Sequence, residues 1–201
     1  GLKDLRSRIA IVPQEPALFS GTLRFNLDPY GQCSDEEIWL ALERTSMKEE
    51  AMDLTDRLDA EVQEGGQNFS IGQRQLLCLT RALLLQSSII VMDEATANID
   101  LETDEQIQKS LRENFKNSTL ITIAHRINTI IDYDRIIVMD AGEIAECDAP
   151  RTLLANEESI FYSLAYEAGV YLEDLVQETY PTPDLNTMVM DSPTFDSSKL
   201  S

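Results

Sequence analysis

Short continuous apolar runs alternate along the chain with longer segments in which apolar residues recur at helical spacing. The runs at 9–12, 88–93 and 119–124 have the length and composition of buried strands, and the run at 88–93 is typical of a parallel strand buried on both faces. Two later apolar stretches, 136–139 and 143–146, are separated by a turn and predict a hairpin. Strands that alternate with helices in this order predict an α/β fold with a parallel sheet.

The helical segments begin with recognisable capping residues. Ser34, with Glu37 three residues later, forms a capping box before an apolar-periodic stretch that runs through Met47. Ser70 can cap a second helix, whose apolar face includes Leu76. Further helices are expected at 101–115 and, as one or two short helices, at 149–168, whereas 19–31 is turn-rich and 51–69 is polar and irregular.

Composition and charge limit the class of protein and its partners. The 201 residues are 43% hydrophobic, which is enough to close a core. The formal net charge of -20 would repel a phosphate backbone, which argues against nucleic acid as a partner. No apolar run approaches the roughly 18 residues that span a bilayer, so the chain is expected to be soluble. Because it begins at Gly1 and not at Met, we expect it to be part of a longer protein.

The cysteines indicate a reducing compartment. Cys33, Cys78 and Cys147 are odd in number and far apart, they form no CxxC pair, and a single histidine is available to help ligate a metal. We therefore expect reduced cytosolic thiols.

The start of the helix at Ser70 is a candidate anion site. Backbone N–H groups, the positive end of the helix dipole and the Ser70 hydroxyl converge there, and Gly72 lets the backbone approach a ligand closely. The sequence around them is Phe-Ser-Ile-Gly-Gln-Arg-Gln. An ordinary capped amphipathic helix explains the same residues and is commoner, so this segment alone leaves both interpretations open.

Two adjacent acids, Asp93 and Glu94, close the apolar run that begins at Ser88. Ligands of α/β sheets bind at the carboxyl edge of the strands, and neighbouring side chains on a strand point in opposite directions. Asp93 can therefore hold Mg²⁺ while Glu94 acts as a base toward a reacting water. His125 ends the next predicted strand at the same edge. Solvated carboxylates at a strand end and a packed or surface histidine are the structural alternatives.

Together these residues resemble the conserved elements of an ABC ATPase. The resemblance covers about 1–168 and implies an α/β, P-loop NTPase-type (RecA-like) fold with a mostly parallel sheet. It also implies a helical signature subdomain inserted at about 30–86. Residues 169–201 form a C-terminal extension, whose content of Pro, Thr, Ser and Asp predicts disorder from about 178. The matching elements are the Q-loop (Gln14), the signature (Ser70, Ile71, Gly72, Gln73), Walker B (Asp93, Glu94), the D-loop (Asn98, Ile99, Asp100) and the switch histidine (His125).

Two details narrow the resemblance to the multidrug-resistance-associated (C) subfamily. The segment Val12–Pro29 is similar to the corresponding segment of that subfamily. The signature begins Leu-Ser-Gly-Gly-Gln in most ABC ATPases, whereas here it starts at Phe69 and resembles the Phe-Ser-Val-Gly-Gln form of this subfamily. The first nucleotide-binding domain of that subfamily often lacks the catalytic glutamate, whereas the second keeps it. Glu94 therefore favours the second domain.

No G-x-x-x-x-G-K-[ST] motif occurs in the sequence, so the resemblance implies an N-terminally truncated domain without its P-loop. In the family, two domains pair head to tail around two ATP molecules with Mg²⁺. Gln14, Asp93, Glu94 and His125 would serve a nucleotide held by the chain's own P-loop, with Asp93 and Gln14 as Mg²⁺ ligands, and the signature and Asp100 would act on the partner's nucleotide. We expect the chain alone to be inactive, to bind ATP negligibly and to expose apolar faces of its core.

For the complete protein, the resemblance implies an exporter of organic anions, conjugates or xenobiotics, driven by ATP hydrolysis. Its partners would be a second nucleotide-binding domain and its own transmembrane domains, at the cytosolic face of a membrane. One alternative is a truncated, non-catalytic paralogue that only docks or regulates. Another is an ABC ATPase of DNA maintenance or translation, against which the acidic charge, the absence of a coiled-coil insert and the segment Phe19–Pro29 all argue.

Overall fold

The computed structural model describes residues 8–93 and 99–176. The chain divides into two compact units, Gly1–Ile131 and Asp132–Ser201. The division between a domain at 1–168 and an extension at 169–201 stays a prediction, and the disordered tail expected from 178 lies outside the described residues.

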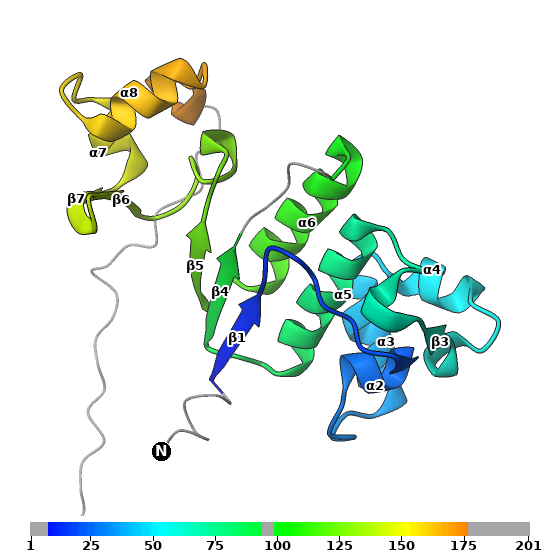
Figure 1. The fold of residues 1–201 in the computed structure, drawn as a ribbon. Helices are drawn as coiled ribbons and strands as arrows, with labels where there is room; N and C mark the ends of the chain where they lie inside the picture. Colours follow the sequence, from blue (N-terminus) through cyan, green and yellow to red (C-terminus); the bar gives the residue numbers. More distant parts are fainter. Residues whose placement is uncertain (1–7, 94–98, 177–201) are drawn as a thin grey trace, which may run out of the picture. The chain divides into compact units, whose positions relative to one another are not determined.

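A parallel sheet of three strands organises the first unit. Its strands are β1 (Ile9–Val12), β4 (Ile89–Asp93) and β5 (Thr119–Ile123), in the order β1-β4-β5 (Figure 1). Both pairings are parallel, with Val12 opposite Met92 and Asp93 opposite Ile123. The predicted strands and the α/β class with a parallel sheet are confirmed.

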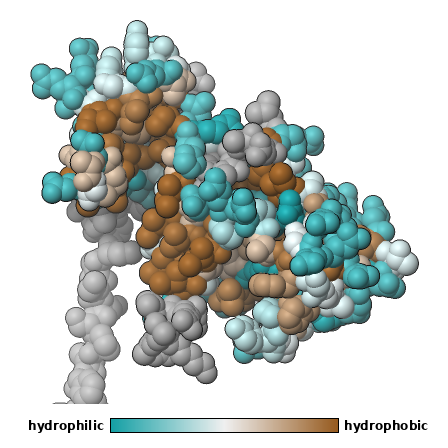
Figure 2. Space-filling model, in the orientation of Figure 1, coloured by the Kyte–Doolittle hydropathy of each residue, from teal (hydrophilic) through white to brown (hydrophobic). Residues whose placement is uncertain are grey.

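The two faces of this sheet differ in burial. One face packs into the core, and its fully buried residues are Ala10, Val12, Ile90 and Met92. On the other face Ile11 is 70% exposed, Ile121 52% and Ile123 55%, and Figure 2 shows a hydrophobic area over the strands. Within β4 itself, Ile90 and Met92 are buried but Ile89 and Val91 are only half-buried, so the prediction that 88–93 is buried on both faces is wrong for the described residues. The exposure of Ile11, Ile121 and Ile123 agrees with the expectation that the chain alone exposes apolar faces of its core.

Helix α5 (Ile71–Leu84) lies at the centre of the core, with Leu76, Leu77 and Leu79 almost completely buried. Helices α3 (Asp35–Arg44) and α6 (Leu101–Asn114) pack against α5 (Figure 1). The predicted capping box of α3 is confirmed. However, α3 ends at Arg44 instead of continuing through Met47, because Ser46 adopts a φ of 57°.

The segments expected to be irregular contain short elements. Strand β2 (Gly21–Thr22) pairs antiparallel with β3 (Glu61–Val62), and Thr22 caps helix α2 (Leu23–Leu27). Helix α4 (Lys48–Asp53) and the 3-10 turn η1 (Arg57–Asp59) precede β3 in the chain, and the 3-10 turn η2 (Glu64–Gly66) follows it. These elements are two to six residues long, which is too short for a periodic pattern to be recognised.

The second unit begins with the predicted hairpin. Strands β6 (Ile136–Asp140) and β7 (Glu143–Asp148) are antiparallel, and the turn residues Ala141 and Gly142 both have positive φ, as a type I′ hairpin turn requires. The Glu146 carboxylate accepts hydrogen bonds from the backbone N–H groups of Ile160 and Phe161, at 2.8 and 3.0 Å. The remaining elements are α7 (Pro150–Leu154), α8 (Ile160–Glu167) and the 3-10 helix η4 (Leu172–Val176).

Two expectations about the chain's chemistry can be compared with the described residues. Cys33, Cys78 and Cys147 are all free thiols, as expected. Burial raises the pKa of the Cys78 thiol, which keeps it protonated near neutral pH. Within residues 8–93 and 99–176, no helix combines the length and the hydrophobicity that a bilayer span requires.

Candidate functional site

Three predicted site residues lie at one edge of the sheet. Gln14 follows β1 by two residues, Asp93 ends β4, and His125 follows β5 by two residues. Because the strands are parallel and Asp93 is paired with Ile123, all three residues lie at the carboxyl edge, on successive strands. Gln14 and His125 are exposed and Asp93 is half-buried. We call these three residues the sheet edge.

The side chains of the sheet edge are not engaged with each other or with the rest of the described chain. The side chains of Gln14, Asp93 and His125 take part in no hydrogen bond or ion pair within residues 8–93 and 99–176. Glu94, the predicted base, and Asn98 of the predicted D-loop lie outside the described residues, so their placement stays a prediction.

Mg²⁺ fits the donor set at this edge. Mg²⁺ in nucleotide sites is held by one or two carboxylates together with substrate phosphates and water, and not by an all-protein cage. Asp93 offers a carboxylate at the end of β4, and Gln14 offers an amide oxygen just after the neighbouring strand β1. A cluster of three or more ligating side chains is therefore not required, and none occurs among the described residues.

The remaining predicted residues lie at the start of α5 and α6. The Ser70 hydroxyl oxygen accepts a hydrogen bond from the Gln73 backbone N–H at 3.1 Å, and the Gln73 side chain accepts one from the Ser70 N–H at 3.0 Å. This capping box leaves the hydroxyl proton of Ser70 free to donate outward. Ile71, the first residue of α5, is 38% exposed.

Gly72 has a packing role that the sequence did not indicate. A Cβ atom at this position would lie 2.2 Å from Cγ2 of Thr103 and 3.5 Å from Cγ2 of Ile99. The first turn of α5 can therefore approach the start of α6 only because residue 72 has no side chain. The contact brings Ser70 and Gln73 into the neighbourhood of the predicted D-loop.

Asp100 caps α6. Its carboxylate accepts hydrogen bonds from the Thr103 backbone N–H at 2.9 Å and from the Thr103 hydroxyl at 2.8 Å. These bonds, the backbone one foremost, lower the pKa of Asp100 below its ordinary value, so the group is an anion at neutral pH. We call Ser70, Gly72, Gln73, Asp100 and Thr103 the helix-start cluster.

An ion pair with a buried carboxylate and an exposed guanidinium connects the sheet edge to the start of α6. Arg126, directly after His125, donates a hydrogen bond of 2.6 Å to Asp104 in the first turn of α6. The Asp104 side chain is only 8% exposed, and its second oxygen is buried without a hydrogen-bond partner among the described residues. The pair fixes the segment that carries His125 against the helix that Asp100 caps. Sequence analysis missed it, although an arginine directly after the candidate histidine could have prompted a search for an acid.

The segment after Gln14 is anchored to α5 by Arg81. The guanidinium donates to the backbone oxygen of Ala17 at 2.7 Å and to the Asn26 side chain at 2.7 Å, and it lies 5.9 Å from the centre of the Phe19 ring. Desolvation lowers the pKa of Arg81, yet the group stays charged at neutral pH. The helix that begins at Ser70 is thus attached to the chain that leaves the sheet edge.

Comparison with known proteins gives consistent matches. The profile described as ABC transporter matches residues 1–97. The chain is 53% identical over 169 residues to ATP-binding cassette sub-family C member 4 of Homo sapiens, which covers 84% of this chain and 13% of that protein. It is 53% identical over 175 residues to Metal resistance protein YCF1 of Saccharomyces cerevisiae (87% and 12%). It is 52% identical over 170 residues to Probable multidrug resistance-associated protein lethal(2)03659 of Drosophila melanogaster (84% and 12%).

The parallel sheet, the polar residues at its carboxyl edge and these matches assign the chain to the ABC transporter family, as part of the ATP-binding domain. The chain spans 12 to 13% of the length of the relatives named above. Within the family it belongs to the C subfamily, the multidrug-resistance-associated branch, as the segment after Gln14 and the form of the signature had indicated.

Proposed function

We propose that this chain is part of the second nucleotide-binding domain of an exporter that hydrolyses ATP to transport organic anions or conjugates. The observation that carries the proposal is the sheet edge, where Gln14, Asp93 and His125 lie at the carboxyl ends of three adjacent parallel strands and their side chains have no partners within the described chain. Polar side chains that converge at the carboxyl edge of a parallel sheet without structural partners are suited to a ligand.

Each residue of the edge has a role that suits its chemistry. The Asp93 carboxylate and the Gln14 amide oxygen hold Mg²⁺, which when bound would neutralise charge on the phosphates. Glu94, which directly follows Asp93 in the sequence and lies outside the described residues, orients the attacking water and accepts its proton. His125 contacts the γ-phosphate, where a donor nitrogen stabilises the charge that develops during in-line attack.

The helix-start cluster acts on a nucleotide held by a second nucleotide-binding domain. The unsatisfied N–H groups at the start of α5 and the outward-donating Ser70 hydroxyl are suited to a terminal phosphate. Ile71, Gly72 and Gln73 supply the turn that presents them. The Asp100 carboxylate already caps the start of α6 and would repel a phosphate there. The positive end of the helix dipole that faces the phosphate is therefore that of α5.

The complete protein would act at the cytosolic face of a membrane, together with its transmembrane domains. Two relatives support an export function by their names, since one is a probable multidrug resistance-associated protein and the other is a metal resistance protein. Organic anions and conjugates are the substrate class that we propose for this chain's parent protein, because their export would account for both kinds of resistance.

The test is Glu94→Gln in the complete transporter. Loss of the general base is expected to lower steady-state ATP turnover by about 10²–10⁴-fold, with ATP binding retained. Glu50→Gln, at an exposed acid of α4, is the matched control and is expected to leave turnover unchanged. Unchanged ATPase activity in Glu94→Gln would refute the assignment. Sequencing upstream of Gly1 separates this proposal from the non-catalytic paralogue, because only the enzyme needs an in-frame P-loop.

A further inference from the structure

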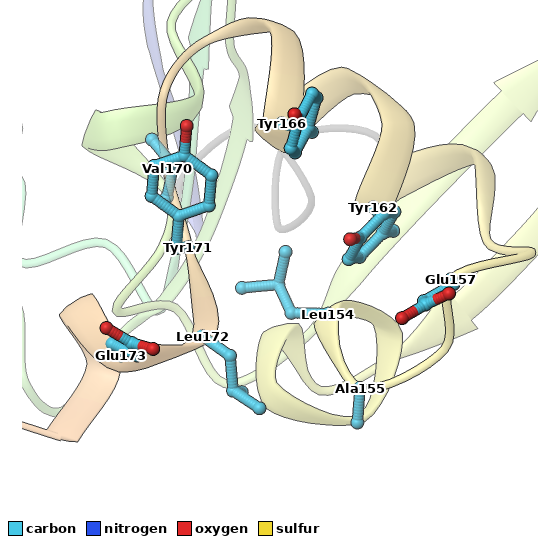
Figure 3. Close-up of a pocket in the computed structure, with 9 residues that line it drawn as sticks. All are labelled: Leu154, Ala155, Glu157, Tyr162, Tyr166, Val170, Tyr171, Leu172 and Glu173. Carbon is cyan, nitrogen blue, oxygen red and sulfur yellow. The ribbon is translucent and has the colours of Figure 1, made fainter.

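A pocket of about 340 Å³ lies in the second unit, bordered by α7, α8 and η4 (Figure 3). Leu154 lies at its base, and the tyrosines of α8 and Tyr171 form its wall. This volume is at the lower end of the range for small-ligand sites, roughly 300–1,000 Å³. The pocket therefore suits a small chemical group and not a nucleotide.

Three tyrosine rings form one continuous aromatic surface on this pocket. Tyr162 and Tyr166 are four residues apart on α8 and so share a face of the helix. Their ring centres are 6.3 Å apart in a stacked arrangement, and the Tyr171 ring meets Tyr166 edge-on at 5.8 Å. Tyr166 is 59% exposed and Tyr171 49%. Contiguous aromatic surface that stays open to solvent in this way marks a binding site more often than a core.

Two carboxylates border the aromatic wall. Glu157 lies beside Tyr162 at one end of the pocket, and Glu173 lies at the other end (Figure 3). Neither carboxylate forms an ion pair or a hydrogen bond with another residue of the described chain. The basic residues between 132 and 176 are Arg135 and Arg151, and neither lines the pocket. Among the described residues, the pocket thus has negative charge and aromatic rings but no basic side chain in its lining.

We propose that this pocket binds a small organic cation, an alkylammonium or guanidinium group. Such cations are attracted to the faces of aromatic rings, and this attraction is the basis of aromatic cages for quaternary ammonium ligands. The two carboxylates add attraction for a cation and repel an anion, so phosphates are excluded. A neutral group of the same shape would gain only the contact with Leu154 and the rings.

The proposal is tested on the chain 1–201 by nuclear magnetic resonance titration with three probes. Choline and N-acetyl-arginine amide carry the two cationic groups, and 3,3-dimethylbutan-1-ol is the uncharged isostere of choline. Saturable shifts of the tyrosine resonances are expected with a cationic probe, at an affinity at least about tenfold above that of the alcohol, which corresponds to ~1.4 kcal/mol. Tighter binding of choline indicates a free small cation, and tighter binding of the arginine amide indicates a side chain of a protein partner. Equal affinity for the alcohol, or no saturable shift with either cation, overturns the proposal.

Matched variants separate the site from the fold. Tyr166→Leu removes a ring and is expected to weaken cation binding several-fold, whereas Tyr166→Phe keeps the ring and most of the affinity. Glu157→Gln is expected to weaken binding of the cationic probes and to leave binding of the alcohol unchanged. Glu158→Gln, at the neighbouring acid outside the pocket, should change neither affinity. Equal losses in Glu157→Gln and Glu158→Gln would mean that only the general acidity of the chain attracts the cation, which contradicts a built site.

Discussion

The sheet edge and the helix-start cluster are built in opposite ways. At the sheet edge, Gln14, Asp93 and His125 are brought together by the register of parallel strands, and their side chains have no partners among the described residues. In the helix-start cluster, every polar side chain is already engaged: Ser70 with Gln73, and Asp100 with Thr103. The polar side chains of the sheet edge are available to a ligand, whereas those of the helix-start cluster also stabilise the fold.

This difference predicts how substitutions will separate stability from activity. A residue whose side chain is engaged in the folded chain contributes to the free energy of unfolding, whether or not it also binds a ligand. A residue without partners contributes little, so its loss is felt only when the ligand is present. Substitutions in the helix-start cluster should therefore destabilise the chain, and those at the sheet edge should not.

The largest effect on stability is expected from Gly72→Ala. The new Cβ would lie 2.2 Å from Cγ2 of Thr103, and Thr103 cannot rotate away without losing its hydroxyl bond to Asp100. Overpacking of this kind should lower the free energy of unfolding by about 2–3 kcal/mol. Urea denaturation of the chain followed by circular dichroism measures the change.

A double-substitution cycle identifies the cause. Thr103→Ser removes Cγ2 but keeps the hydroxyl that donates to Asp100, so the combination of Gly72→Ala with Thr103→Ser should recover most of the lost stability. If the two losses simply add, contact with Cγ2 of Thr103 is not the cause of the destabilisation, which contradicts the packing role assigned to Gly72.

The sequence predicted the features that depend on local patterns. Buried strands and capped helices are visible in runs of neighbouring residues, which is why β4, α5 and the capping box at Ser34 were predicted. The sheet edge was predictable too, since parallel strands that each end in a polar residue align those residues. Contacts between distant residues leave no such pattern. The pair of Arg126 and Asp104, and the approach of Gly72 to Thr103, depend on tertiary packing and were missed.

A smaller loss is expected from Ser70→Ala, and Ser34→Ala provides its matched control. Both serines form capping boxes of the same kind, at the starts of α5 and α3. Each alanine should cost about 1 kcal/mol in the free energy of unfolding, because one N–H of the first turn loses its acceptor. In the complete transporter, only Ser70→Ala should also lower ATP turnover. An equal loss of turnover in Ser34→Ala would attribute the effect to stability alone.

Asp100 should make stability depend on pH. Its folded-state pKa is lowered by the hydrogen bonds from Thr103, so its contribution is present above the unfolded-state pKa of about 3.9 and is lost as the pH falls through the lower folded-state value. Asn caps a helix about as well as Asp but does not titrate. Asp100→Asn should therefore match the parent chain in thermal stability at neutral pH and lose less on acidification. The melting temperatures of both chains are measured from neutral pH down to about pH 3. If they fall equally on acidification, the pKa of Asp100 is not lowered by folding, which contradicts this prediction.

The smallest effect on stability is expected at the sheet edge itself. Gln14→Ala and His125→Ala remove exposed side chains that have no partner among the described residues, so each should change the free energy of unfolding by no more than about 0.5 kcal/mol. In the complete transporter, His125→Ala should nevertheless reduce ATP turnover on the order of 10²-fold, the usual cost of removing one donor to a developing negative charge. Urea denaturation and steady-state ATPase assays of the same variants measure the two quantities. A variant that loses stability in proportion to activity would show that the edge is structural, and the contrast with the helix-start cluster would disappear.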